Sequence, residues 1–108
     1  MGNGRLAMES KDQAPVRYGI EVVYDWSIHK WKIQTFQDDK WVAVESYMHQ
    51  QDAVVNAFVD VYNFEKKYGF EPNLRLHEKS GAMARFATPH AWIKLAKQKF
   101  EDQNETSD

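Results

Sequence analysis

The feature that most constrains the fold is a segment of helical spacing, residues 50–68, that is apolar around most of its circumference. Its polar side chains form one narrow stripe at i, i+3 and i, i+4 spacing: Asp52, Asn56, Asp60, Asn63 and Lys67. A helix that lies on one face of a sheet needs an apolar arc of only about 100°. We therefore expect this helix to contact a second element besides a sheet, which is either the C-terminal helix or another copy of the chain.

The end of this helix is better marked than its start. Gly69 is a natural terminating residue, because glycine readily adopts the left-handed conformation found just after a helix. Lys66 and Lys67 lie in the last predicted turn, where positive charge complements the helix dipole. Asp52 is the only nearby candidate for an N-terminal cap.

The segment before the helix, residues 17–47, has the alternation of side chains that is typical of β-strands. Ile20, Val22 and Tyr24 are spaced to face one side of a sheet. Two β-rich runs then flank residues 37–40, which predicts a hairpin. Because this link has no glycine, we expect a longer loop built on a type I turn rather than a two-residue turn. The whole segment is predicted to be a three-stranded antiparallel meander.

The segment after the helix predicts a returning strand and a second helix. Leu74 and Leu76 alternate with polar residues, which indicates a fourth strand, and residues 82–86 are a candidate fifth. Thr88 is a good N-cap and Pro89 fits the first helical position. An amphipathic helix is therefore expected over residues 88–101.

Together these segments predict an α+β domain: a three-stranded antiparallel meander, a helix, a returning strand or hairpin at 73–86, and a C-terminal amphipathic helix. Residues 1–16 are interpreted as a flexible polar arm, 17–101 as the single domain and 102–108 as a disordered acidic tail. The step at Met8 leaves open whether the first residues belong to the natural protein. The predicted core comprises Val22, Ile33, Val42, Val44, Val54, Phe58, Val61, Tyr62, Leu74 and Leu76.

Composition excludes several classes of function. The 108 residues include no cysteine, which rules out disulfides, thiol catalysis and cysteine zinc sites. A formal net charge of −2 argues against a dedicated nucleic-acid binder. No apolar run approaches the roughly 20 residues of a membrane span, and the N-terminus lacks the apolar part of a secretory signal. We therefore expect a cytoplasmic protein that does not bind membranes.

The residue patterns predict no catalytic residue, metal site or cofactor. The four histidines are scattered and none is spaced as a metal-binding pair: His29, His49, His77 and His90. No serine lies in a G-x-S-x-G context, and no glycine-rich loop could cradle a phosphate. The adjacent Asp38 and Asp39 are explained by turn formation.

Three short pieces of the chain resemble one known group of proteins. They are Trp41-Val42-Ala43-Val44, Asp52-Ala53, and Leu74 to Gly81 (LRLHEKSG). Over residues 19–83 the pattern is similar to that of small uncharacterised bacterial meander–helix–strand domains. The chain departs from that pattern at His49 and Gln50, where a threonine usually precedes the helix, and in its additional C-terminal helix. The resemblance implies the fold and no activity.

Exposed aromatic side chains favour a protein–protein interface, in which such residues are enriched. Trp26 and Trp31 flank a connection that is expected to be exposed, and Trp92 and Phe100 lie on the C-terminal helix. The leading prediction is a non-catalytic binding module, such as an accessory or inhibitor protein of a phage or mobile element. Its partner is another protein or a second copy, in a homodimer through the helices 50–68 and 88–101. Alternatively, the C-terminal helix folds back and the protein is a monomer.

Nucleic-acid binding is the alternative function. Its candidate residues are basic and lie on or near two predicted strands: Lys30, Lys32, Arg75, Lys79 and Arg85. If these strands are neighbours, the outer sheet face combines positive charge with the ring of Trp31, which suits single-stranded nucleic acid. An ordinary solvated sheet face would explain the same residues.

Overall fold

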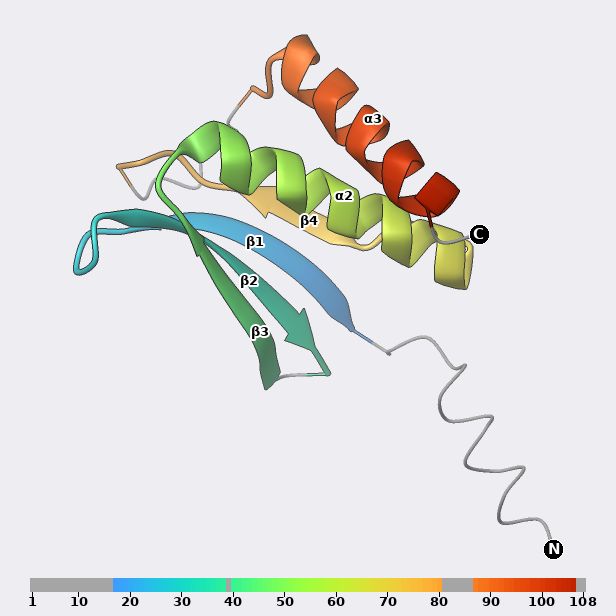
Figure 1. The fold of residues 1–108 in the computed structure, drawn as a ribbon. Helices are drawn as coiled ribbons and strands as arrows, with labels where there is room; N and C mark the ends of the chain where they lie inside the picture. The colour runs from blue at the N-terminus through green and yellow to red at the C-terminus, as the bar shows by residue number, and fades with distance from the viewer. Residues whose placement is uncertain (1–16, 39, 81–86, 107–108) are drawn as a thin grey trace, which may run out of the picture.

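The structure, a computed structural model, describes residues 17–38, 40–80 and 87–106. In chain order the elements are β1 (Tyr18–Asp25), β2 (Lys30–Gln37), β3 (Lys40–Tyr47), α2 (Gln50–Tyr68), β4 (Asn73–Leu76) and α3 (His90–Thr106). The strands form one sheet in the order β3-β2-β1-β4. Helix α2 lies on one face of this sheet and α3 lies on the far side of α2 (Figure 1). The predicted α+β architecture is confirmed, and the candidate fifth strand at 82–86 lies outside the described residues.

The sheet is mixed because the chain crosses back over it through α2. Strands β1, β2 and β3 form the predicted antiparallel meander. Strand β4 then joins β1 in parallel, with Leu74 opposite Ile20. This places β1 in the interior of the sheet, and among the described strands β3 and β4 are its two edges.

The turn between β2 and β3 is shorter than predicted. Gln37 pairs with Lys40, so only two positions link the strands. Asp38 has φ of 50°, in the left-handed region that Asp tolerates better than most residues. The backbone N–H of Arg17 donates to Asp38 Oδ1 at 2.9 Å, and the N–H of Asp38 donates to the Arg17 carbonyl at 2.8 Å. The prediction of a longer loop is wrong, because Asp38 supplies the conformation for which glycine was expected.

The wide apolar surface of α2 is divided between two neighbours. Its residues Val54 and Val61 pack against the sheet in the main core. Val55 and Val59 pack against Ala96 of α3 in a second cluster. Within the described residues, α3 is therefore the second neighbour that the sequence required, and the helix surface needs no other copy of the chain to cover it. The left-handed Gly69 ends α2 as predicted, with φ of 86°.

Helix α3 continues further than the sequence indicated. It begins at His90, where the Pro89 carbonyl accepts the first helical hydrogen bonds, and it ends at Thr106. The last turns are held against α2, because Lys66 Nζ donates to Asn104 Oδ1 at 2.6 Å. Residues 102–106 therefore belong to the helix, and the prediction of a disordered tail over them is wrong.

Two predicted core residues lie on the surface. Val42 is 52% exposed and Val44 is 55% exposed. Only the end of β3, at Tyr47, packs against the core under α2, while the rest of the strand runs out beyond the helix (Figure 1). Val44 also lies opposite Gln34, on the sheet face that α2 does not cover. These two core predictions are wrong because an edge strand has apolar side chains without a layer above them.

Candidate functional site

Trp31, one of the predicted interface residues, belongs to the core. It is 6% exposed and lies on the sheet face under α2. The ring of Tyr24 contacts it edge-on, with centroids 5.2 Å apart. An interface residue must be accessible to a partner, so the expectation of an exposed Trp31 is wrong. The ring also lies on the opposite face from Lys30 and Lys32, because neighbouring residues of a strand alternate.

Trp26, in contrast, is 58% exposed in the turn between β1 and β2. Its Nε1 donates to the carbonyl of Lys79 at 3.2 Å. The Lys79 ammonium lies 5.2 Å from the Trp26 ring centroid and 4.7 Å from that of Tyr24. These contacts attach the β1–β2 turn to the segment after β4, so Trp26 already has a structural role within the chain.

Trp92 and Phe100 lie between the two helices. Trp92 is half-buried and packs against both apolar clusters. Phe100 meets the ring of Tyr62 on α2 edge-on, with centroids 5.7 Å apart. The four predicted interface aromatics are therefore distributed over three places, the core, a turn and the helix–helix contact, and form no common surface.

The basic residues predicted for nucleic-acid binding are also divided. Lys30, Lys32 and Arg75 lie on the sheet face away from α2, called here the open face. Lys79 instead contacts aromatic rings at the end of the sheet, and Arg85 lies outside the described residues.

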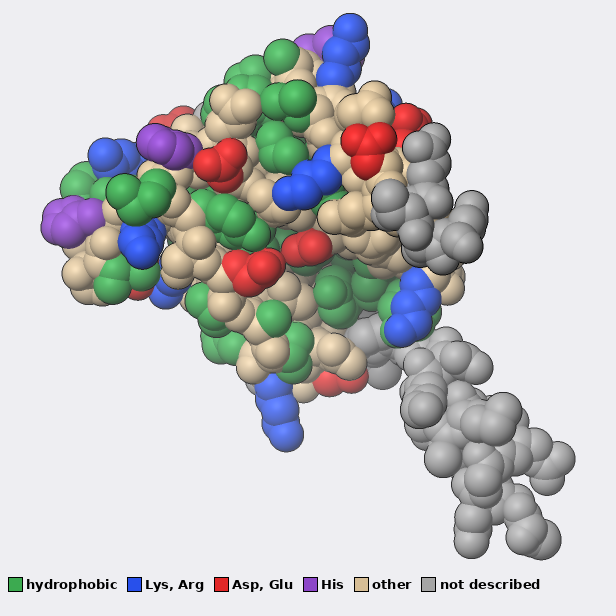
Figure 2. All heavy atoms as spheres, viewed as in Figure 1, with side chains coloured by type: hydrophobic (Ala, Val, Ile, Leu, Met, Phe, Trp, Pro, Cys, Tyr) green, Lys and Arg blue, Asp and Glu red, His purple; other side chains and the backbone are tan. Residues whose placement is uncertain are grey.

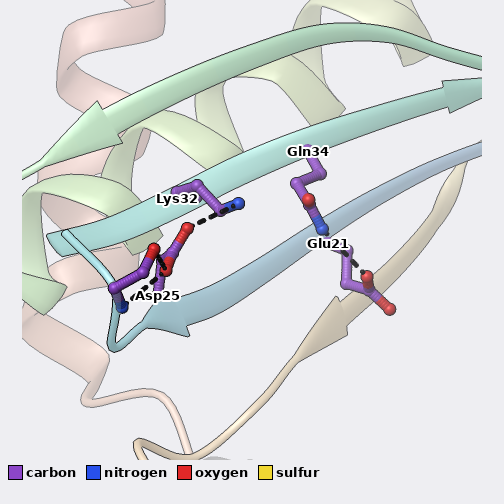
Figure 3. A network of polar contacts seen from close by, with 5 residues as sticks. Glu21, Asp25, Lys32 and Gln34 are labelled. Atoms are coloured by element: carbon purple, nitrogen blue, oxygen red, sulfur yellow. Dashed lines mark hydrogen bonds and ion pairs between the residues drawn. The ribbon is translucent and has the colours of Figure 1, made fainter. Parts of the chain in front are cut away.

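Carboxylates lie among the basic residues on the open face (Figure 3). Lys32 Nζ is 3.0 Å from Asp25 Oδ2. Hydrogen bonds from Ser27, followed by the contact with Lys32, lower the pKa of Asp25 to about 2. Glu21, in the middle of the face, accepts a hydrogen bond from Gln34 at 3.5 Å and lies 3.0 Å from His77 Nε2. A phosphate backbone would meet these two carboxylates as well as Lys30, Lys32 and Arg75, so much of the positive charge that would attract it is already offset. Nucleic-acid binding through these residues stays a prediction.

The most exposed apolar strand was not among the predicted sites. Trp41, Val42 and Val44 of β3 are each more than half exposed, and Phe36 of β2 meets the Trp41 ring edge-on at 5.2 Å. We call these four residues and the free edge of β3 the β3 surface. Figure 2 shows hydrophobic side chains at the surface along the part of the molecule where Figure 1 places β3.

A β-bulge sets the arrangement of these side chains. Thr35 pairs with Ala43 and Phe36 pairs with Trp41, so Val42 is an extra residue outside the ladder. The bulge brings Trp41 onto the open face beside Phe36, where strict alternation with Val44 would have directed it to the other face. The sequence predicts a regular strand over residues 41–47, and the run of apolar side chains on both sides of Val42 was the only sequence signal of an exposed surface.

The open face is hollowed beside the β3 surface. A pocket of 590 Å³ includes Gly19, whose missing side chain leaves the strand bare between β2 and β4. Phe36 and Trp41 line the pocket together with Phe70 and Arg75. The apolar area of β3 therefore continues onto the sheet rather than ending at the edge strand.

The other side of β3 carries acidic groups that interact with α2. Burial, followed by the nearby Glu45 of β3, raises the pKa of Asp60 on α2 to about 6, although Lys99 acts in the opposite direction. Burial together with Glu45 and Asp60 also raises the pKa of Tyr47 to about 12. Acidic groups therefore lie between β3 and α2, on the side of β3 opposite the open face.

No group of three His, Asp or Glu side chains among the described residues could hold a metal ion. The contact between His77 and Glu21 joins β4 to β1 across the sheet. In the same part of the chain, neither helix has the length and apolar composition that a membrane crossing requires.

Comparison with protein-family models, curated proteins and solved structures finds no match to this chain. The resemblance to small bacterial meander–helix–strand domains stays a prediction. Function is therefore inferred from the geometry of the chain itself, and above all from the β3 surface.

Proposed function

We propose that this chain is a non-catalytic binding module and that it acts through a protein–protein surface formed by β3. The observation that carries the proposal is the exposure of Trp41, Val42 and Val44 on an edge strand. A scattered exposed apolar side chain needs no explanation, whereas a contiguous group of them is typical of an interaction site.

The backbone of β3 supports the same function. Its inner side pairs with β2, and no other described strand lies along its outer side. The outer N–H and C=O groups of such an edge can pair with a strand from a partner. In this mode of recognition the main chain supplies affinity and the alternate side chains supply specificity. Trp41 and Val44 would contact the partner on the open face.

The proposal also includes a cellular location and a class of protein. We place the module in the cytoplasm because the chain has no cysteine, which fits a reducing compartment. An accessory or inhibitor protein of a phage or mobile element remains our proposed class, because small chains without catalytic groups are common there.

Site-specific photo-crosslinking tests the proposal. A benzoylphenylalanine at position 44 on β3 is expected to give a crosslinked protein product in the native cell. The matched control is position 95 on α3, where the native Leu95 is also apolar and exposed. The absence of a product from position 44, or an equal product from position 95, would remove β3 as the binding surface.

A further inference from the structure

The two edges of the sheet differ in length and in charge. Strand β4 has four residues, whereas β3 has eight, Lys40–Tyr47. Natural edge strands are usually protected from pairing by shortness, proline, charge or a β-bulge. Strand β3 has the bulge at Val42, but it is not short and has no proline. The charged residues of β3 are Lys40 and Glu45, of opposite sign and on either side of the apolar residues. Opposite charges at separated positions allow an antiparallel copy of the same strand to lie alongside.

The pairing of β3 with β2 shows which of its side chains share a face. Lys40, Ala43 and Glu45 are directed to the α2 side of the sheet, and Trp41 and Val44 to the open side. In an antiparallel pair, residues that lie opposite each other must share a face. This requirement limits the registers in which two copies of β3 could pair.

One register brings both the charged and the apolar residues together. Ala43 lies opposite Ala43 of the second copy, and Val42 stays outside the pairing as it does with β2. Trp41 then lies opposite Val44 of the second copy on the open face, and Lys40 lies opposite Glu45 on the other face. Two-fold symmetry makes each of these contacts occur twice.

We propose that a second copy of this chain occupies the β3 surface, with the two β3 strands paired antiparallel in this register. The proposal rests on the proposed function, since it names the partner of the same surface. The two sheets join into one continuous sheet, because the two-fold axis is perpendicular to it. Both open faces, and the pockets beside Trp41, then lie on the same side of the dimer.

The surroundings of Glu45 favour a positively charged side chain from the second copy beside this carboxylate. No ion pair among the described residues joins Lys40 or Glu45 to another charged side chain. Glu45 instead lies near the carboxylate of Asp60, and the pKa of Asp60 is raised in part by it. Lys99 of α3 offsets part of this repulsion within the single chain, and a lysine from the second copy would offset more of it.

Exchange of the two charges tests the register. Sedimentation velocity is measured for the wild-type protein and for Lys40→Glu and Glu45→Lys, with circular dichroism to confirm that each variant is folded. The wild type is expected to dimerise. Each single variant is expected to dissociate more readily by about tenfold or more, because two attractive pairs become two repulsive pairs.

Mixing the two single variants provides the matched control. The Lys40→Glu chain is acidic at both positions and the Glu45→Lys chain is basic at both. An equal mixture restores both attractive pairs, so it is expected to form a heterodimer of wild-type strength. The double variant Lys40→Glu/Glu45→Lys is expected to dimerise with itself for the same reason. Both results require position 40 to lie opposite position 45 and would not follow from a general loss of folding.

Two results would overturn the proposal. One is a wild-type protein that stays monomeric, and the other is a dimer whose stability does not respond to the charge exchanges. If position 44 nevertheless crosslinks to a different protein, the β3 surface remains a binding site and only the second copy is excluded. If position 44 gives no product at all, the proposed function fails together with this inference.

Discussion

Helix α2 and strand β3 are both rich in apolar residues, yet the structure covers one and leaves the other exposed. The sheet buries one side of α2, and α3 buries another through Val55, Val59 and Ala96. In the part of the chain that the structure describes, strand β3 has a neighbour on one edge and no helix over Val42 or Val44. The difference between α2 and β3 teaches that apolar side chains indicate a surface that needs another surface to cover it. Whether the partner lies in the same chain depends on where the remaining elements can reach.

The largest loss of stability is expected from a substitution in the covered surface of α2, where it meets α3. Ala96→Asp places a charge in the fully buried contact between α2 and α3. The free energy of unfolding is expected to fall by about 3 kcal/mol, since the carboxylate has no partner there. Urea denaturation would measure the loss. Leu95→Asp is the matched control, because the adjacent side chain is exposed and its replacement should change stability by less than about 0.5 kcal/mol. Equal effects of the two changes would show that α3 does not cover α2.

A smaller loss of stability is expected when a buried valine of the sheet is shortened to alanine, and an exposed valine of the same sheet serves as the comparison. Val22→Ala on β1 removes a fully buried side chain and is expected to cost about 2 kcal/mol of unfolding free energy. The same change at Val44 on β3 should cost less than about 0.5 kcal/mol. Urea denaturation at low protein concentration, where association does not contribute, would measure both. A similar cost at the two positions would mean that Val44 is covered within the single chain.

The smallest effect concerns the acidic boundary between α2 and β3. The folded state raises the pKa of Asp60 to about 6 from its ordinary value of 3.8, so folding favours the protonated carboxyl. Stability is therefore expected to rise as the pH falls from about 7 through 6 toward 4, and to be lower wherever Asp60 is ionised. Asp60→Asn should stabilise the protein by about 1 kcal/mol above pH 7, after allowance for solvent screening, and should remove this pH dependence.

Thermal unfolding measured across this pH range provides the readout for Asp60. The control is Asp52→Asn, at the exposed start of the same helix, which should keep the rise in stability toward pH 4. If Asp60→Asn leaves the pH profile unchanged, the carboxylate of Asp60 is not held in a desolvated site beside Glu45.

Much of the fold could be predicted because local patterns set it. Alternation in β1 and β2 predicted their strands and inward residues, and Gly69 ended α2 where its conformational freedom indicated. The pattern was less informative where a local exception changed the geometry. Asp38 adopted a left-handed conformation without glycine, and the bulge at Val42 changed which side chains of β3 share a face.

The candidate site was harder to predict than the fold. The place of Trp31 after a turn predicts exposure, but its position in β2 directs it under α2. Trp41 was missed because it lies in a strand that resembles a core strand. Aromatic residue type alone does not distinguish these two cases, since each ring directly follows a lysine at the start of its strand. The face of the sheet and the layer above it decide which ring can meet a partner.

The sequence alone determined the identity and order of the elements, since side-chain periodicity and turn residues act between neighbours along the chain. It also determined that α2 needs a second contact, because the width of an apolar arc is a property of the helix itself. Only the tertiary structure decided that α3 makes that contact, that β4 returns beside β1, and that β3 is left as an exposed edge. These outcomes depend on packing between residues far apart in the chain, where the burial of one surface determines which others remain open to solvent.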